Sequence, residues 1–111
     1  MKVEVTNSGH VAIVNVEGRV DSSTAAAFDT SLADALVGDV KSLVLECSHL
    51  TYLSSAGLRA ILLAVKRTSK VDGKVAVCAV QSHILEVLEV SGFTRLVKVA
   101  GSVTEARSAI T

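Results

Sequence analysis

Two adjacent serine hydroxyls, Ser54 and Ser55, stand in the segment TYLSSAGLRAIL at residues 51–62. A serine hydroxyl can attack a substrate, accept a phosphoryl group, or cap a helix by accepting a hydrogen bond from an unpaired backbone N–H. Catalysis would need a G-x-S-x-G turn or an orienting base, but glycine only follows these serines and the nearby His49 has no assignable acid partner. On its residues alone, the segment therefore predicts a helix cap and no enzyme.

Residues that could hold a metal ion or a nucleotide form no recognisable site. Cys47 and His49 lie two positions apart, but His10 and His83 are far away in the sequence, so we predict no metal centre and no cofactor. The chain contains neither a G-x-x-x-x-G-K-[ST] loop nor a G-x-G-x-x-G turn. A small nucleotide-binding protein is kept as an alternative that only the fold type favours.

The composition indicates one compact α/β domain over residues 1–111. Half of the residues are hydrophobic and only three are aromatic, so Val, Leu, Ile and Ala must build the core. A formal net charge of zero argues against direct binding to nucleic acid. No apolar run approaches the roughly 20 residues that span a bilayer, so we expect no membrane insertion. Cys47 and Cys78 sit in apolar runs, which predicts reduced core thiols and a cytoplasmic protein.

Strand patterns alternate with helix patterns along the chain, and these elements must position the serines. Residues 3–6 and 11–17 predict an antiparallel hairpin joined by the turn Asn7-Ser8-Gly9. Further strands are predicted at residues 42–47, 74–80 and 96–99. The first of these three is apolar on nearly all positions of both faces, which is typical of a central strand covered by helices.

Four helices are predicted from cap residues and apolar spacing. They run from the caps at 21–23 to Gly38, from the serine segment to Asp72-Gly73, from the cap Ser82 to Ser91-Gly92, and from the Ser102/Glu105 capping box to about Ile110. In the second helix, a core-facing stripe is expected at Leu58, Ile61, Leu62 and Val65.

The resulting order, β-β-α-β-α-β-α-β-α, predicts an α/β fold with a mixed, mostly parallel sheet of four to five strands and about four helices. In such sheets, functional groups gather beyond the carboxyl ends of the strands. Two predicted loops lie there, at residues 18–23 and 48–56, and the second loop holds the serines. We therefore expect the candidate site in these loops.

The segment LVLECSHLTYLSSAGLRAILLAVKR, residues 43–67, resembles the signature of the STAS domain found in bacterial anti-sigma-factor antagonists. That signature is a hydrophobic strand, an aspartate, a short loop, and then Asp-Ser-Ser/Thr-Gly-Leu opening a helix. Glu46 falls at the first acidic position and residues 54–58 match the motif, with Ser54 in the place of its aspartate and Ala56 in the place of its second hydroxyl residue. GRVD, residues 18–21, is similar to the family's turn before its first helix.

The resemblance implies a protein-binding switch that regulates transcription. Ser55 then corresponds to the residue phosphorylated by a serine kinase that is also the anti-sigma factor, with Ser54 as the alternative acceptor and a PP2C-type phosphatase as the second partner. The unmodified form would bind the anti-sigma factor and release the sigma factor. The second reading keeps the fold without the switch, as a STAS adaptor subunit of a transporter or signalling complex. The oligomeric state stays open.

The resemblance also implies a partner-binding surface, formed by Asp21, Ser54, Ser55, Ala56, Gly57 and Arg59. Gly57 has two readings, clearance for a partner's backbone or close packing inside the fold. Asp21 is expected to orient the kinase or phosphatase, to cap the first helix, or to do both. Arg59 and the lysines after it are either a docking face for an acidic partner or ordinary solvated surface.

Overall fold

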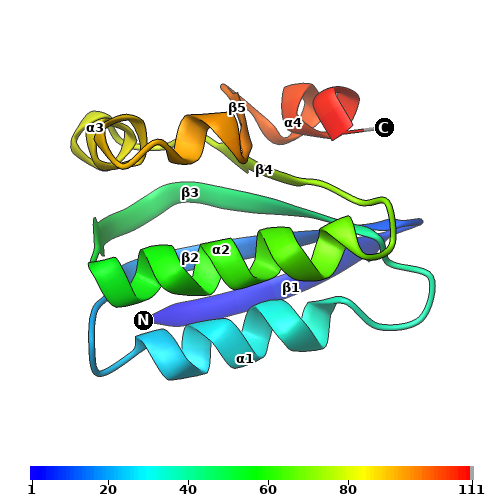
Figure 1. Cartoon of the computed structure of the whole chain (residues 1–111), viewed down its shortest axis with the longest axis horizontal. Helices are drawn as coiled ribbons and strands as arrows, with labels where there is room; N and C mark the ends of the chain where they lie inside the picture. The colour runs from blue at the N-terminus through cyan, green and yellow to red at the C-terminus, as the bar shows by residue number, and fades with distance from the viewer. Residues whose placement is uncertain (111) are drawn as a thin grey trace.

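The computed structural model describes residues 1–110 and places helices on both faces of a five-stranded sheet (Figure 1). The strands are β1 (Lys2–Ser8), β2 (Val11–Val20), β3 (Ser42–Leu53), β4 (Val75–Cys78) and β5 (Lys98–Ala100). The helices are α1 (Ala25–Ala35), α2 (Ser55–Ser69), α3 (Ser82–Val90) and α4 (Val103–Ile110), with a 3₁₀ turn over Phe93–Arg95. Within residues 1–110, no helix has both the length and the apolar character needed to cross a membrane.

The strands lie in the sheet in their order along the chain, β1-β2-β3-β4-β5. β1 pairs antiparallel with β2, and each later strand pairs parallel with the strand before it. The predicted α/β fold, with its element order and its mixed, mostly parallel sheet, is confirmed. Because β2 and β3 run in the same direction, both of them end at the left of Figure 1.

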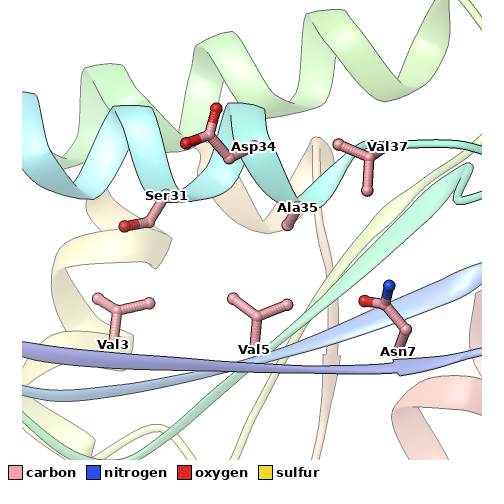
Figure 2. Close-up of a pocket in the computed structure, with 7 residues that line it drawn as sticks. All are labelled: Val3, Val5, Asn7, Ser31, Asp34, Ala35 and Val37. Atoms are coloured by element: carbon pink, nitrogen blue, oxygen red, sulfur yellow. The ribbon is translucent and has the colours of Figure 1, made fainter.

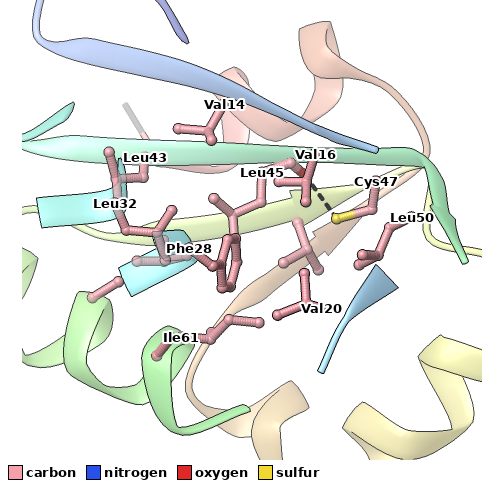
Figure 3. Packing of buried hydrophobic residues seen from close by; sticks show 14 of the residues in the cluster. Val14, Val16, Val20, Phe28, Leu32, Leu43, Leu45, Cys47, Leu50 and Ile61 are labelled. Atoms are coloured by element: carbon pink, nitrogen blue, oxygen red, sulfur yellow. Dashed lines mark hydrogen bonds between the residues drawn. The ribbon is translucent and has the colours of Figure 1, made fainter. Parts of the chain in front are cut away.

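Apolar side chains on both faces of the sheet hold the helices in place. α1 and α2 cover one face, where Phe28, Leu32, Leu45 and Ile61 are buried in the main cluster (Figure 3). α4 covers part of the other face through its buried residue Ala106. Each large apolar side chain that is fully buried contributes about 1.5–3 kcal/mol, so the positions of α1 and α2 on the sheet are well determined.

Both cysteines are free and buried. The Cys47 thiol lies in the main cluster and donates to the Leu45 carbonyl oxygen at 3.4 Å (Figure 3), while Cys78 lies in the cluster beneath α4. Burial raises the pKa of the Cys47 thiol to about 12 and the pKa of the Cys78 thiol to about 11. Both cysteines therefore act as small, neutral core residues, as the sequence predicts.

β2 and β3 extend beyond their predicted ends, to Val20 and Leu53. Their pairing shifts between Asn15 and Glu17 and again between Gly18 and Arg19, and at each place β3 accommodates one extra residue. These bulges break the simple alternation of apolar and polar residues, which made the second half of β3 look like a loop. The predicted loops at residues 18–23 and 48–56 are therefore wrong in extent, since most of the second one is strand.

The residues that α2 buries differ from the core-facing stripe predicted from the sequence. Leu58, Leu62 and Val65 are only half-buried. The fully buried positions are Gly57, Ala60, Ile61, Ala64 and Thr68. Apart from Ile61 these are small residues, so the backbone of α2 can approach the sheet closely.

The helix starts agree with the sequence in part. Thr24 is the N-cap of α1 and Gln81 is the N-cap of α3, and neither side chain makes a capping hydrogen bond, so the predicted caps at 21–23 and at Ser82 are wrong. The capping box of α4 is confirmed. The Ser102 hydroxyl accepts from the Glu105 N–H at 3.2 Å, and the Glu105 carboxylate accepts from the preceding Gly101 N–H at 3.0 Å.

Candidate functional site

The two predicted site segments meet at the carboxyl ends of β2 and β3. The Ser54 N–H donates to the Val20 carbonyl oxygen at 2.8 Å, so the turn that follows Val20 lies next to the serine pair. α1 and α2 both begin at this edge, at the left of Figure 1. The structure thus brings Asp21 together with Ser54 and Ser55.

Ser54 is the N-cap of α2. Its backbone is extended (φ −83°, ψ 172°), and its hydroxyl oxygen accepts from the Gly57 N–H at 3.2 Å. Its carbonyl oxygen accepts from the Leu58 N–H at 2.9 Å and so opens the helix. This hydroxyl therefore satisfies one of the backbone donors that the first turn of the helix leaves unpaired.

Ser55 is the first residue of α2, and its side chain is exposed. In the part of the chain that the structure describes, its hydroxyl has no hydrogen-bond partner. The first turn of α2 contains no acidic residue, so nothing there offsets the positive end of the helix dipole. An anion on Ser55 would lie beside backbone N–H groups that the first turn leaves unpaired, and the fold can tolerate it.

The different roles of the two hydroxyls predict different stabilities for their alanine variants. Ser54→Ala should lower the free energy of unfolding by about 1 kcal/mol because an N-cap hydrogen bond is lost. Ser55→Ala should change it by less than about 0.5 kcal/mol, as expected at an exposed position. Urea unfolding followed by circular dichroism measures both, and equal effects of the two substitutions would contradict the assignment of the cap.

Asp21 organises the turn between β2 and α1. Its Oδ1 accepts from the Ser23 hydroxyl at 2.7 Å, from the Ser23 N–H at 2.9 Å and from the Thr24 N–H at 3.2 Å. These hydrogen bonds, with that of the Ser23 hydroxyl foremost, hold the pKa of the Asp21 carboxyl below its usual value. Since Thr24 holds the N-cap position, the prediction that Asp21 caps α1 is wrong. Asp21 instead holds the turn before α1, and its second carboxylate oxygen lies 3.8 Å from Nε of Arg19.

Gly57 packs inside the fold. A Cβ atom at this position would lie 2.5 Å from Cδ1 of Leu53 and 2.8 Å from Cγ1 of Val20. The glycine therefore lets the first turn of α2 rest on the last residues of β2 and β3. Of the two readings that the sequence allowed, close internal packing is observed, and the reading that Gly57 clears space for a partner's backbone is wrong.

Ala56 and Arg59 line a shallow groove between the first halves of α1 and α2. The other lining residues are Ala25, Ala26, Asp29, Ala60 and Leu63. Asp29 is paired with Arg67 at 2.8 Å, whereas the Arg59 side chain is exposed. The predicted partner-binding residues on α2 thus border an open groove next to Ser55.

Glu46, at the first acidic position of the motif, lies on the other face of the sheet from α1 and α2. It accepts from the Ser48 N–H at 2.9 Å and borders a depression that also contains Glu17 and His49. Cys47 is buried under the helices while His49 is exposed, so these two residues do not form a metal site. Within residues 1–110, no three potential ligands among His, Cys, Asp and Glu are grouped for a metal ion.

Two residues that the sequence analysis did not single out as site residues attach the start of α3 to β3. The Gln81 amide donates to the Ser48 carbonyl oxygen at 2.9 Å, and Nε2 of His83 lies 2.8 Å from the Thr51 carbonyl oxygen. Both residues stand where the chain leaves β4 and enters α3. The rule that selected the loops after β2 and β3 applies equally to this third loop, and it would have found them.

The comparisons with known proteins agree with this architecture. The family model of the STAS domain matches residues 2–106. BtrV of Bordetella bronchiseptica, named as an anti-sigma factor antagonist, is 34% identical over 102 residues, which are 92% of this chain and 88% of that protein.

Two solved structures show the same fold. An anti-sigma factor antagonist from Mycobacterium paratuberculosis has a TM-score of 0.84 at 19% identity, covering 98% of this chain and 92% of that one. The Bacillus cell fate determinant SpoIIAA in its phosphorylated form has a TM-score of 0.75 at 14% identity, covering 97% and 98%. The family model that spans residues 2–106, together with the 34% identity to BtrV, shows that the chain belongs to the STAS domain family.

Proposed function

We propose that this STAS domain is an anti-sigma factor antagonist whose binding is switched by phosphorylation of Ser55. The observation that carries the proposal is the contrast between the serines at the start of α2. Ser54 is bound as the cap, and Ser55 is exposed with an unused hydroxyl. The naming of BtrV as an anti-sigma factor antagonist supports the same function.

In this proposal the unmodified domain binds an anti-sigma factor that is also a serine kinase, and the sigma factor is released. The kinase transfers a phosphoryl group to Ser55, a PP2C-type phosphatase removes it, and the exchange takes place in the cytoplasm. The domain itself catalyses neither step. Asp21, Ala56 and Arg59 border the acceptor and supply the surrounding contact surface.

A phosphate on Ser55 would act at the interface and leave the fold intact. It adds roughly −1.5 to −2 charges and a strongly hydrated group, which is costly to bury against a partner. A loss of about 3–4 kcal/mol at the interface weakens binding by roughly two to three orders of magnitude. Arg59 lies one helical turn after Ser55 on the same face of α2, so the phosphate would also compete with the partner for its guanidinium.

Capture from native extract tests the proposed function against the adaptor reading. The full chain is immobilised as wild type, Ser55→Ala and Ser55→Asp, and the retained proteins are identified by mass spectrometry. We expect the wild type and Ser55→Ala to retain an anti-sigma factor with a kinase domain, and Ser55→Asp to lose it. If all three baits retain the same transporter or signalling proteins, the domain is an adaptor and the proposed switch is wrong.

A further inference from the structure

Within residues 1–110, β1 is the first strand in the order and pairs only with β2, so one edge of the sheet is unpaired. The hairpin turn has two residues and is flanked by the pair Ser8 and Val11. In a two-residue hairpin the flanking pair is the hydrogen-bonded kind. Hydrogen-bonded and non-hydrogen-bonded pairs alternate along an antiparallel ladder. The backbone N–H and C=O groups of Val3, Val5 and Asn7 therefore point away from β2, toward the free edge.

The side chains of these same three residues border a groove. Figure 2 shows Val3, Val5 and Asn7 pointing from β1 toward the second half of α1, where Ser31, Asp34, Ala35 and Val37 form the opposite wall. Val5 is 44% exposed and Val37 is 55% exposed. A row of free backbone groups and a partly apolar groove thus run side by side, which is the combination that binds an extended peptide strand.

Asp34 gives the groove a preference for a positively charged partner. Among the described residues that line the groove it is the only charged one. Its exposed side chain stands at the rim, with the carboxylate turned away from β1 (Figure 2). In residues 1–110 it has neither an ion pair nor a hydrogen bond from another side chain. A lysine or arginine of a bound strand can reach this carboxylate, and an acidic side chain would be repelled.

A second copy of the chain fits this edge less well than a basic segment does. If two copies paired through β1 around a two-fold axis at Val5, their outward backbone groups would match. The same axis would bring the Asp34 carboxylates of both copies to one continuous groove, where like charges oppose association.

We propose that the outer edge of β1 and this groove form a docking site for an extended, basic peptide segment. The segment adds a strand to the sheet and places alternate apolar side chains and one lysine or arginine against α1. The site lies along the last turns of α1, whereas Ser55 lies beside the first turns. A peptide can therefore bind here independently of the switch at Ser55, and the site is additional to the proposed antagonist function.

The test uses the full chain and a blocked, fluorescently labelled heptapeptide, Thr-Val-Thr-Lys-Thr-Val-Thr, whose valines and lysine fall on one face. We expect saturable binding by fluorescence anisotropy, and in ¹⁵N NMR the largest shifts at the amides of Val3, Val5 and Asn7. Asp34→Lys should weaken binding at least about tenfold. Glu89→Lys, which makes the same charge change on exposed α3, should bind as the wild type does.

A charge swap keeps the test decisive. The peptide with glutamate in place of lysine should fail to bind the wild type and should bind Asp34→Lys. The proposal is overturned if the wild type does not bind the lysine peptide, if Asp34→Lys binds it equally well, or if the shifts fall away from β1 and α1. A wild-type dimer in light scattering that becomes monomeric in Val5→Lys would also overturn it, because a second copy would then occupy the edge.

Discussion

Ser55→Asp is expected to weaken the binding of the anti-sigma factor by about ten- to a hundredfold. The substitution places a carboxylate in the first turn of α2, where the helix dipole stabilises it within the fold, but the partner must desolvate that charge on binding. A carboxylate carries less charge than a phosphate, so its effect should fall below that of phosphorylation. Isothermal titration of the purified chain with the captured partner measures the change.

Two matched variants separate this effect from a general effect of charge. Thr104→Asp adds the same charge to the first turn of α4, on the other face of the sheet, at an exposed position, and should leave the affinity unchanged. Ser55→Ala should bind as the wild type does, because the substitution adds neither charge nor bulk at the interface. Equal affinities for the wild type and Ser55→Asp would show that the interface does not include this residue.

Gly73→Ala is expected to destabilise the fold far more than the loss of the helix cap in Ser54→Ala. A Cβ atom at Gly73 would lie 1.6 Å from the Lys41 carbonyl oxygen and 2.5 Å from the Lys41 carbonyl carbon. Neither atom can move without shifting the backbone that leads into β3. The Gly73 N–H also donates to the Thr68 carbonyl oxygen at 2.8 Å, and the next N–H donates to the Ser42 hydroxyl at 2.9 Å. Hydrogen bonds from two consecutive N–H groups thus fix the turn between α2 and β4 to the end of α2 and to the start of β3.

The cost of Gly73→Ala should be about 3 kcal/mol or more, which corresponds to a fall in Tm on the order of 10–20 °C. Differential scanning calorimetry measures it directly. Gly101→Ala is the control, because a Cβ there meets only the flexible Glu105 carboxylate at 3.2 Å, and its Tm should stay within a few degrees of the wild type. A similar Tm for both variants would mean that the turn at Gly73 can relax away from the Lys41 carbonyl group.

The sequence predicts the fold well because its strongest signals are local. The antiparallel hairpin, the apolar strands and the helix segments each depend on neighbouring residues, and their order determines the topology. The predicted turn Asn7-Ser8-Gly9 is wrong, because Asn7 and Ser8 continue β1 and the turn consists of Gly9 and His10. The second half of β3 escapes this reasoning, since its buried residues Leu50 and Leu53 are three positions apart instead of two. Bulges create that spacing, and they depend on how β3 pairs with β2, which no local pattern reveals.

The candidate site is predictable in its residues but less so in their roles. The motif selects Ser54 and Ser55, yet only the hydrogen bond to the Gly57 N–H shows which hydroxyl is committed to the helix. From the sequence alone, Gly57 could equally provide clearance for a partner or allow close packing inside the fold. Its contacts with Leu53 and Val20 decide between these two roles. Such roles depend on contacts between residues far apart in the sequence.

The most direct test of the switch is to locate the phosphate. The purified chain is incubated with the captured kinase and ATP, and the products are analysed by intact-mass and tandem mass spectrometry. We predict one phosphate on Ser55 in the wild type and in Ser54→Ala, and none in Ser55→Ala. A phosphate on Ser54, or the same incorporation in Ser55→Ala as in the wild type, would contradict the account.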